Sequence, residues 1–221
     1  MSKIIAIGDI HGELGKLKDL FAKLSFSKED TIVFLGDYID RGKESKGVID
    51  FILDLKDKCN LVALKGNHEQ FALDTFKDPE GNMAGSWVMN GGINTLTSYQ
   101  ETQSLEKCLT TALKTMERVH GDFLKSLPII HETENHIFVH GFLEGAADTD
   151  DQDEIMCIWG RYKDIWPHKS GKTVVCGHSV QRDGAVDDGF KICIDTGSFK
   201  PKGYITALVV ENYKKTFITS Q

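Results

Sequence analysis

The chain has 221 residues, of which 40% are hydrophobic and 27% charged, and its formal net charge at pH 7 is -7. These are ordinary globular proportions, with enough length to bury a core, and we expect one domain over residues 1–221. The excess of acidic residues argues against non-specific attraction to nucleic acid or to an anionic membrane surface. No apolar run in the sequence approaches the roughly 20 residues that span a bilayer.

The five cysteines are odd in number and widely spaced, with no pair at zinc-finger or redox-motif separation. We therefore expect reduced, packed thiols. Residues 1–3 lead directly into a short apolar run, which is too short for the hydrophobic region of a signal peptide. These features predict a soluble, cytoplasmic protein that binds neither membrane nor nucleic acid, and we expect a monomer.

The first third of the chain alternates between short apolar runs and amphipathic segments. Apolar runs predict strands at residues 3–7, 31–35 and 61–64. Between them, apolar residues recur at helical spacing over residues 13–24 and 48–55, and each of these segments presents one apolar face. The order strand, helix, strand, helix, strand indicates an α/β layered fold.

From about residue 70 to 130 the chain turns helical and polar, which predicts a helical cap on the sheet, with the clearest helical spacing at residues 105–119. Within it, residues 87–92 (Trp-Val-Met-Asn-Gly-Gly) favour a turn that is either a wall of a substrate site or an ordinary connection. The acid-rich residues 148–154 favour a solvated loop. Further strands are expected at residues 136–139, 173–176, 191–194, 204–210 and 216–218.

Polar clusters follow the ends of the three early strands. They are Gly-Asp-Ile-His-Gly at 8–12, Gly-Asp-Tyr-Ile-Asp-Arg-Gly at 36–42 and Gly-Asn-His-Glu at 66–69. Two later histidines, His140 and His178, also end apolar runs. Ligands of open α/β sheets bind at the carboxyl ends of the strands. A lone histidine at a strand end is usually structural, but two of them beside three such clusters indicate a shared site.

A pair of hydrolytic metal ions needs oxygen and imidazole ligands from separate strands, one carboxylate that bridges, and open positions for water and substrate. The sequence offers such a set. The candidate ligands are Asp9 and His11 for one ion, Asn67, His140 and His178 for the other, and Asp37 as the bridge. The pattern therefore predicts a dinuclear-metal phosphoester hydrolase.

These motifs, in this order and spacing, resemble the phosphoprotein phosphatase family of metallophosphoesterases, especially its compact bacterial and bacteriophage members. The resemblance covers residues 3 to about 198. It implies a calcineurin-like metallophosphoesterase fold, which is an α/β layered β-sandwich flanked by helices, here with a helical insertion. It also implies two divalent metal ions, typically manganese, with iron or zinc as alternatives. The oxygen and nitrogen ligands agree with these metals without choosing among them.

The resemblance further implies a mechanism in which a hydroxide that bridges the two metals attacks phosphorus in line, with no phosphoenzyme. Arg41 is suited to bind the phosphate through two parallel hydrogen bonds, which a lysine does not imitate. A second phosphate-binding arginine is expected at Arg161, for which a structural role is the alternative. His68 would protonate the leaving oxygen, and Asp40 would orient its imidazole.

Other polar residues near the motifs receive weaker interpretations. Glu69 either supports its loop or acts directly. Asp195 and Ser198 follow a strand near the site and are expected to serve loop structure. The histidines that match no motif position are expected to be structural or solvent-facing, and they are His120, His131, His136 and His168.

For the substrate, we expect a serine/threonine protein phosphatase that acts on phosphorylated proteins or peptides, with phosphotyrosine and small phosphoesters left open. The rival is a symmetrical diadenosine tetraphosphatase or another nucleotide phosphohydrolase. Bacterial enzymes of that kind usually lack the second aspartate of the middle motif and carry Gly-Asn-His-Asp. Asp40 and Glu69 therefore favour the protein phosphatase.

The sequence differs from the larger eukaryotic phosphatases in one loop, and one alternative function from another class is a scaffold. Residues 198–201 (Ser-Phe-Lys-Pro) lack the tyrosine-bearing loop of the larger eukaryotic phosphatases, so toxin sensitivity and regulatory subunits are not carried over. A metal-binding scaffold without catalysis would need a missing ligand, and the sequence lacks none.

Overall fold

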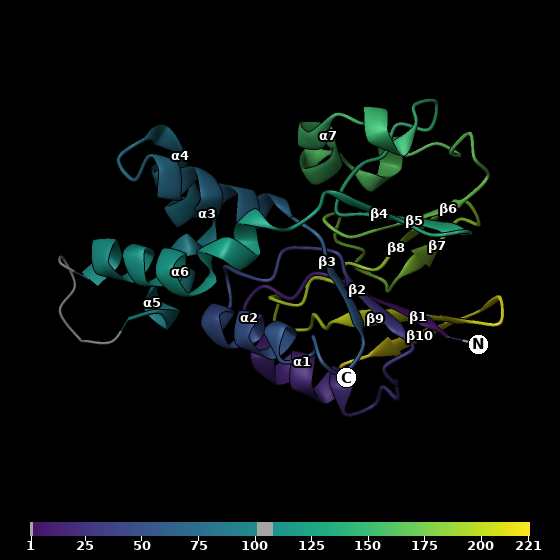
Figure 1. The fold of residues 1–221 in the computed structure, drawn as a ribbon, viewed down its shortest axis with the longest axis horizontal. Coiled ribbons are helices and arrows are strands. Elements are labelled where there is room, and N and C mark those ends of the chain that lie inside the picture. The colour runs from purple at the N-terminus through teal and green to yellow at the C-terminus, as the bar shows by residue number, and fades with distance from the viewer. Residues whose placement is uncertain (1, 101–107) are drawn as a thin grey trace.

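The structure is a computed structural model that describes residues 2–100 and 108–221. Two sheets, each of five strands in the described chain, lie face to face, with helices on their outer faces and a group of helices at one end (Figure 1). This arrangement confirms the expected α/β sandwich flanked by helices.

The first sheet has the order β10-β9-β1-β2-β3. Its strands are β1 (Ile4–Ile7), β2 (Thr31–Phe34), β3 (Asn60–Ala63), β9 (Thr206–Glu211) and β10 (Lys214–Thr219). β1, β2 and β3 are parallel, while β9 runs antiparallel to β1 and β10 antiparallel to β9. The carboxyl ends of the three early strands therefore meet at one edge, as expected.

The second sheet has the order β4-β5-β6-β8-β7. Its strands are β4 (Ile130–Glu132), β5 (His136–Val139), β6 (Thr173–Cys176), β7 (Val186–Asp187) and β8 (Lys191–Cys193). β5, β6 and β8 are parallel, and the short strands β4 and β7 pair antiparallel with their neighbours. The sequence did not predict β4 and β7, which are only three and two residues long.

The alternation of side chains along the strands divides the core into layers. In β1, Ile5 and Ile7 pack against α1 (Leu14–Phe21) and α2 (Ser45–Leu53), whereas Ala6 faces the second sheet. Phe138 of β5 faces the first sheet in turn, and its neighbour Ile137 faces outward with Cys157 of α7 (Glu154–Trp159). The sandwich is thus helix, sheet, sheet, helix.

The polar middle of the chain forms helices at one end of the sandwich (Figure 1). They are α3 (Asn67–Lys77), α4 (Asn82–Trp87), the π-helical turn η1 (Val88–Gly92), α5 (Ile93–Ser98) and α6 (Cys108–Lys125). Short 3-10 turns occur at η2 (Thr149–Asp151) and η3 (Tyr162–Asp164). Residues 105–107 of the helix expected at 105–119 lie outside the described residues.

The turn expected at residues 87–92 is confined to one residue. The backbone is helical on both sides of Gly91, whose φ of 105° is not helical, and the chain kinks there between two helices. A glycine adopts this φ without the penalty of a side chain, so the bend falls at the first glycine of the Gly-Gly pair. The acid-rich stretch before α7 is largely exposed, and Asp153 caps that helix by accepting hydrogen bonds from Ile155 N and Met156 N.

Within the described part of the chain, every helix is too short or too polar to cross a bilayer.

Candidate active site

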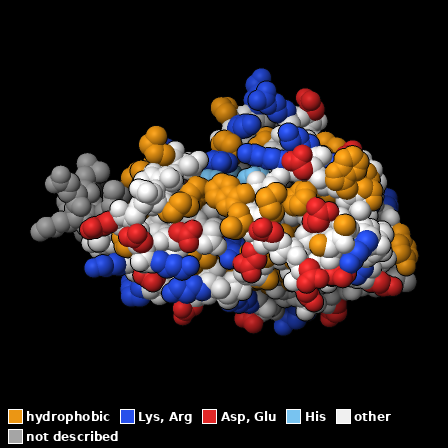
Figure 2. All heavy atoms as spheres, turned by 90° about the horizontal axis from the view of Figure 1, so that it is seen from above, with side chains coloured by type: hydrophobic (Ala, Val, Ile, Leu, Met, Phe, Trp, Pro, Cys, Tyr) orange, Lys and Arg blue, Asp and Glu red, His pale blue; other side chains and the backbone are white. Residues whose placement is uncertain are grey.

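The strand-end loops bring all the predicted polar residues to one edge of the sandwich. Asp9 and His11 follow β1, Asp37 follows β2, His140 follows β5 and His178 follows β6. Asn67 and His68 are the first residues of α3. Figure 2 shows histidine side chains at the bottom of a hollow, between a row of Lys and Arg side chains and a group of hydrophobic ones. Residues more than 160 positions apart therefore share one site.

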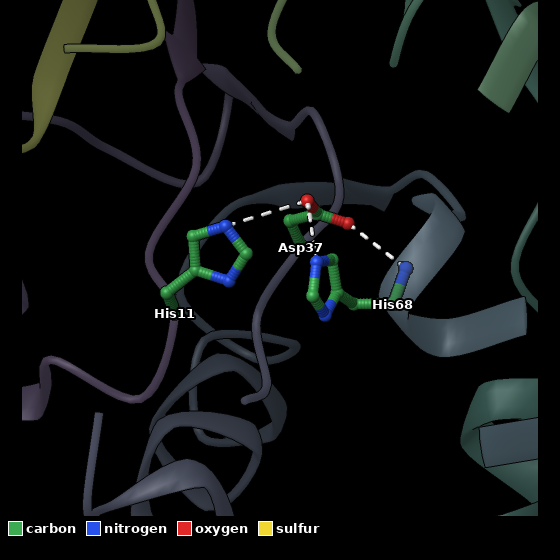
Figure 3. Close-up of side chains that lie close together, drawn as sticks. All are labelled: His11, Asp37 and His68. Carbon is green, nitrogen blue, oxygen red and sulfur yellow. Dashed lines mark hydrogen bonds and ion pairs between the residues drawn. The ribbon is translucent and has the colours of Figure 1, made fainter. Parts of the chain in front are cut away.

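Asp37 stands at the centre of this site. Its carboxylate is shared by two groups of side chains, one with His11 and His68 and one with His140 and His178, and within each group the ligand atoms lie within 4.8 Å of one another. His11 Nε2 is 3.4 Å from Asp37 Oδ2, and His140 Nε2 is 3.4 Å from Asp37 Oδ1. Figure 3 shows the imidazoles of His11 and His68 both directed at this carboxylate.

Two imidazoles have their tautomer set by the backbone. His11 Nδ1 lies 2.9 Å from the carbonyl oxygen of Ile39, and His140 Nδ1 lies 2.9 Å from that of Leu35. Because a carbonyl only accepts, each Nδ1 carries the proton and each Nε2 keeps a lone pair that faces the site. Burial lowers the pKa of both rings. Neutral imidazoles oriented in this way are typical metal ligands.

His178 supplies a second sign that a metal fits. Its Nε2 is buried and has no hydrogen-bond partner among the described residues. Burial, with the neighbouring His140 and Arg161, lowers the pKa of His178 to about 3, so the ring is neutral. Asn67 Oδ1 lies 3.1 Å from His140 Nε2, on the same side of the site. A buried nitrogen without a partner is costly unless a ligand satisfies it.

Asp9 is buried beside two other carboxylates. Its oxygens accept hydrogen bonds from the backbone N–H of His178 at 3.2 and 3.1 Å. Burial and repulsion by Asp195 and Asp37 raise the pKa of Asp9 well above its ordinary value. Asp37 shows the opposite balance, since burial opposes its ionisation but His140, His68 and His11 outweigh it and lower its pKa.

A divalent cation would relieve the repulsion between Asp9 and Asp37, because it compensates negative charge in a site that excludes water. The sequence analysis expected Asp9 beside His11, but the group of ligand atoms that includes His11 and Asp37 has His68 as its third member. His68 nevertheless has another partner, described below, which suits a proton carrier better than a ligand. The set of carboxylate, amide and imidazole donors fits two hard or borderline divalent ions.

The loops that carry these residues are held in unusual backbone conformations. His11, Asp37, Asp40, Arg41 and His178 all have positive φ, between 50° and 72°. Residues other than glycine rarely adopt this region, and where they do the surrounding structure must enforce it. Such strain concentrates at functional sites, which agrees with the placement of all five around one hollow.

Glu69 supports the Asp37 loop. Its carboxylate is fully buried and accepts hydrogen bonds from the backbone N–H groups of Asp37 at 2.8 Å, Tyr38 at 2.9 Å and Gly66 at 2.9 Å. A Cβ on Gly66 would lie 2.3 Å from Asp37 Oδ1, so only glycine fits there. Of the two roles expected for Glu69, its contacts favour support of the loop.

His68 and Asp40 form a buried pair. His68 Nδ1 lies 2.6 Å from Asp40 Oδ2, and its Nε2 faces the metal-binding residues at 3.9 Å from Asp37 Oδ2. Burial opposes protonation, but Asp37 and Asp40 outweigh it and raise the pKa of His68. Asp40 has two further partners, Trp87 and Thr95, that the sequence did not predict. The one feature of the sequence near Trp87 that drew attention was the Gly91-Gly92 pair, which suggested a turn.

The two arginines differ in placement. Arg41 Nη1 donates to His11 Nε2 at 2.6 Å, and the guanidinium carbon lies 4.2 Å from the centre of the Phe199 ring. Arg161 is exposed, with a charge close enough to affect His178, and it follows Trp159, whose ring centre is 6.4 Å from that of His178. Both cations therefore border the site.

Ser198 is a loop residue as expected, since its hydroxyl donates to Ile10 O at 3.0 Å. The unmatched histidines bond elsewhere: His120 to Tyr99 and Asp50, and His168 to Ser170 and Ala147. In the described chain, Cys59, Cys157, Cys176 and Cys193 are buried free thiols.

A buried carboxylate shared by imidazole groups, with arginines beside it and a histidine bound to a second carboxylate facing it, defines a metal-dependent phosphoesterase. Residues 2–193 match the family model described as calcineurin-like phosphoesterase, and the chain belongs to that family. It is therefore an enzyme, a phosphoester hydrolase.

Relatives refine this assignment. The chain is 30% identical, over 89% of its own length and 88% of the relative's, to "Serine/threonine-protein phosphatase 2" of Salmonella typhimurium. Its fold is similar to a structure titled "Crystal structure of a putative diadenosine tetraphosphatase", with a TM-score of 0.69, 21% identity and coverage of 99% and 93% of the two chains. A cold-active protein tyrosine phosphatase is also similar, with a TM-score of 0.68, 18% identity and coverage of 99% and 78%.

Proposed function

We propose that this protein is a metal-dependent phosphomonoesterase that removes phosphate from serine and threonine residues of proteins. The observation that carries the proposal is His68, whose Nδ1 is bound to Asp40 while its Nε2 faces Asp37. The relative named as a serine/threonine phosphatase supports the substrate class, because the match covers nearly the whole of both chains. The structural neighbours are under 25% identical, so they support the fold alone.

The ligands of the two ions would be Asp9, His11, Asp37, Asn67, His140 and His178. When bound, two divalent ions supply Lewis-acid chemistry and a water activated for in-line attack at neutral pH. His11 would hold a metal through the Nε2 lone pair that here accepts from Arg41. The Arg41 guanidinium would then be free to bind two phosphate oxygens, and Arg161 would bind from the exposed rim.

His68 would hold the proton that the leaving oxygen needs. Serine and threonine alkoxides are poor leaving groups, so a donor in the transition state matters for them. Asp40 binds Nδ1–H and so directs Nε2–H into the site. Asp37 and the same Asp40 carboxylate stabilise the imidazolium against burial, and so they raise the pKa of His68.

The first experiment measures hydrolysis of p-nitrophenyl phosphate with added Mn²⁺. We expect activity that a chelator removes and that Asp37→Asn lowers by at least 10²-fold, while His68→Asn, which removes a general acid, lowers it by up to about 10²-fold. Asp57→Asn and His131→Asn are the matched controls, since Asp57 is exposed, His131 stacks on Phe138, and neither belongs to the groups around Asp37. No activity with manganese, iron or zinc would refute the proposed function.

The second experiment compares substrates. Phosphoserine, phosphothreonine and phosphotyrosine peptides are assayed beside diadenosine tetraphosphate, because the structural neighbours bear the names of a tyrosine phosphatase and a diadenosine tetraphosphatase. We expect the highest kcat/KM on phosphoserine or phosphothreonine. A clear preference for the dinucleotide would replace the protein phosphatase by a nucleotide phosphohydrolase.

We also propose manganese as the metal, residues 1–221 as one domain, and a cytoplasmic monomer. One hydrophobic cluster joins Ile5 and Phe34 of the first sheet to Trp87 and Met116 of the end helices, which supports one cooperative unit. The buried free thiols suit a reducing compartment. Metal analysis, a single unfolding transition and the mass in solution test these proposals.

A further inference from the structure

Asp40 is fully buried, and its carboxylate is surrounded by donors from outside its own loop. Trp87 Nε1 donates to Oδ2 at 2.8 Å and contacts Oδ1 at 3.0 Å, and Thr95 Oγ1 donates to Oδ1 at 2.6 Å. His68 Nδ1 takes the remaining position on Oδ2 at 2.6 Å. Both oxygens are therefore occupied, and three side chains determine how the carboxylate is turned.

Thr95 also fixes the backbone of Asp40. Its Oγ1 accepts the Asp40 N–H at 2.8 Å and lies 2.9 Å from the hydroxyl of Ser45. Asp40 has a φ of 72°, which an aspartate adopts only when its surroundings hold it there. A single threonine therefore binds this residue at both its amide and its carboxylate.

The kink in the helical segment explains how these donors reach the loop. Gly91 O accepts the Arg41 N–H at 3.3 Å, and Asn94 Nδ2 donates to Arg41 O at 2.5 Å. A Cβ on Gly91 would lie only 2.7 Å from Arg41 N. The bend at Gly91 thus lays the segment from Trp87 to Thr95 directly against residues 40 and 41.

We propose that Trp87 and Thr95 are positioning residues for the reaction, which act by holding Asp40 so that His68 presents Nε2 to the substrate. This inference rests on the proposed role of His68. A carboxylate with fewer donors in a buried site turns or loses its charge, and the imidazole bound to it loses its orientation. The helical segment from Trp87 to Thr95 then contributes to proton transfer, in addition to covering one end of the sandwich.

The competing explanation is packing alone, because Trp87 is a large, fully buried side chain of the core. Variants that each remove one donor separate the two, since a loss of packing alone should lower the rates on both esters equally. Trp87→Phe keeps a ring but loses the N–H donor, and Thr95→Val keeps the shape but loses the hydroxyl. Thr95→Ser restores the hydroxyl. Trp166→Phe and Thr97→Val are matched controls at exposed positions, and Thr97 lies on the same helix as Thr95.

The test uses two esters in Mn²⁺-loaded enzyme. On a phosphoserine peptide, whose alkoxide needs a proton, we expect kcat of Trp87→Phe and Thr95→Val to fall about tenfold, part of the 10²–10⁴-fold that a general acid supplies. KM should stay within twofold. On p-nitrophenyl phosphate, whose leaving group departs with little protonation, kcat should fall less than threefold. Thr95→Ser should recover most of the loss.

Equal losses on both esters, or unchanged kcat on the peptide, would overturn the inference while the proposed function stands. Failure of the wild-type enzyme on both esters would overturn both. A second readout does not depend on turnover. In ¹H–¹⁵N spectra, the Trp87 indole signal, assigned from Trp87→Phe, should move strongly in Asp40→Asn, and an unmoved signal would also overturn the inference.

Discussion

Replacing Glu69 with glutamine tests how the Asp37 loop is held. Glu69 Oε2 accepts two backbone N–H groups and Oε1 accepts one, all at 2.8 to 2.9 Å in a fully buried setting. The amide of glutamine offers one acceptor oxygen, so it retains at most the pair at Oε2. Its NH₂ then faces the N–H of Tyr38, and both buried donors are left without an acceptor.

The cost follows from that count. One lost hydrogen bond, together with the buried donors left unpaired, amounts to about 3 kcal/mol of unfolding free energy. For a chain of this size each kcal/mol shifts Tm by roughly 2–4 °C, so Tm should fall by about 6–12 °C. Because the loop holds Asp37, the apparent affinity for Mn²⁺ should also fall, by about 10- to 100-fold, as for other residues that support metal ligands.

Urea unfolding in the presence of a chelator measures the stability change, and activity against Mn²⁺ concentration measures the affinity. Glu80→Gln, at an exposed position, is the matched control and should leave both unchanged. If Glu69→Gln keeps the wild-type unfolding midpoint and metal dependence, the three hydrogen bonds do not hold the loop and the reasoning is wrong.

Two further predictions concern the helices at the end of the sandwich. Gly91→Ala should cost about 1–3 kcal/mol, because φ is +105° and the new Cβ would meet Arg41 N, whereas Gly85→Ala, which meets nothing within 4 Å in α4, should be neutral or stabilising by up to about 1 kcal/mol. Urea midpoints of the two variants compare them, and equal midpoints would contradict the strain at Gly91. Burial lowers the pKa of His120 despite the attraction of Asp50, so the unfolded state takes up the proton first as pH falls. The unfolding free energy should therefore decline as pH drops below about 6.5, the ordinary histidine value, and His120→Gln should show a shallower decline. An identical pH slope in the variant would show that His120 contributes nothing.

The sequence by itself determined the positions of most strands along the chain and the residues that meet at their ends. Short apolar runs predicted β1, β2, β3, β5 and β6, and parallel strands of one sheet must bring their carboxyl ends to one edge. Polar residues directly after such strands therefore had to meet. For this reason the sequence alone predicts that Asp9, Asp37 and Asn67 share an edge of the first sheet. His178 follows β6 of the second sheet, so its place beside Asp37 also depends on how the two sheets pack face to face.

Only the tertiary structure decided which atoms meet within that site. Helical spacing in the middle of the chain predicted buried faces, but periodicity does not say what a buried side chain touches. The contact of Trp87 with Asp40 joins residues 47 positions apart and depends on the kink at Gly91, where local composition predicted a turn. The backbone partners of His11, His140 and Glu69 likewise depend on how loops from different strands pack, because hydrogen-bond partners are set by distances in the folded chain.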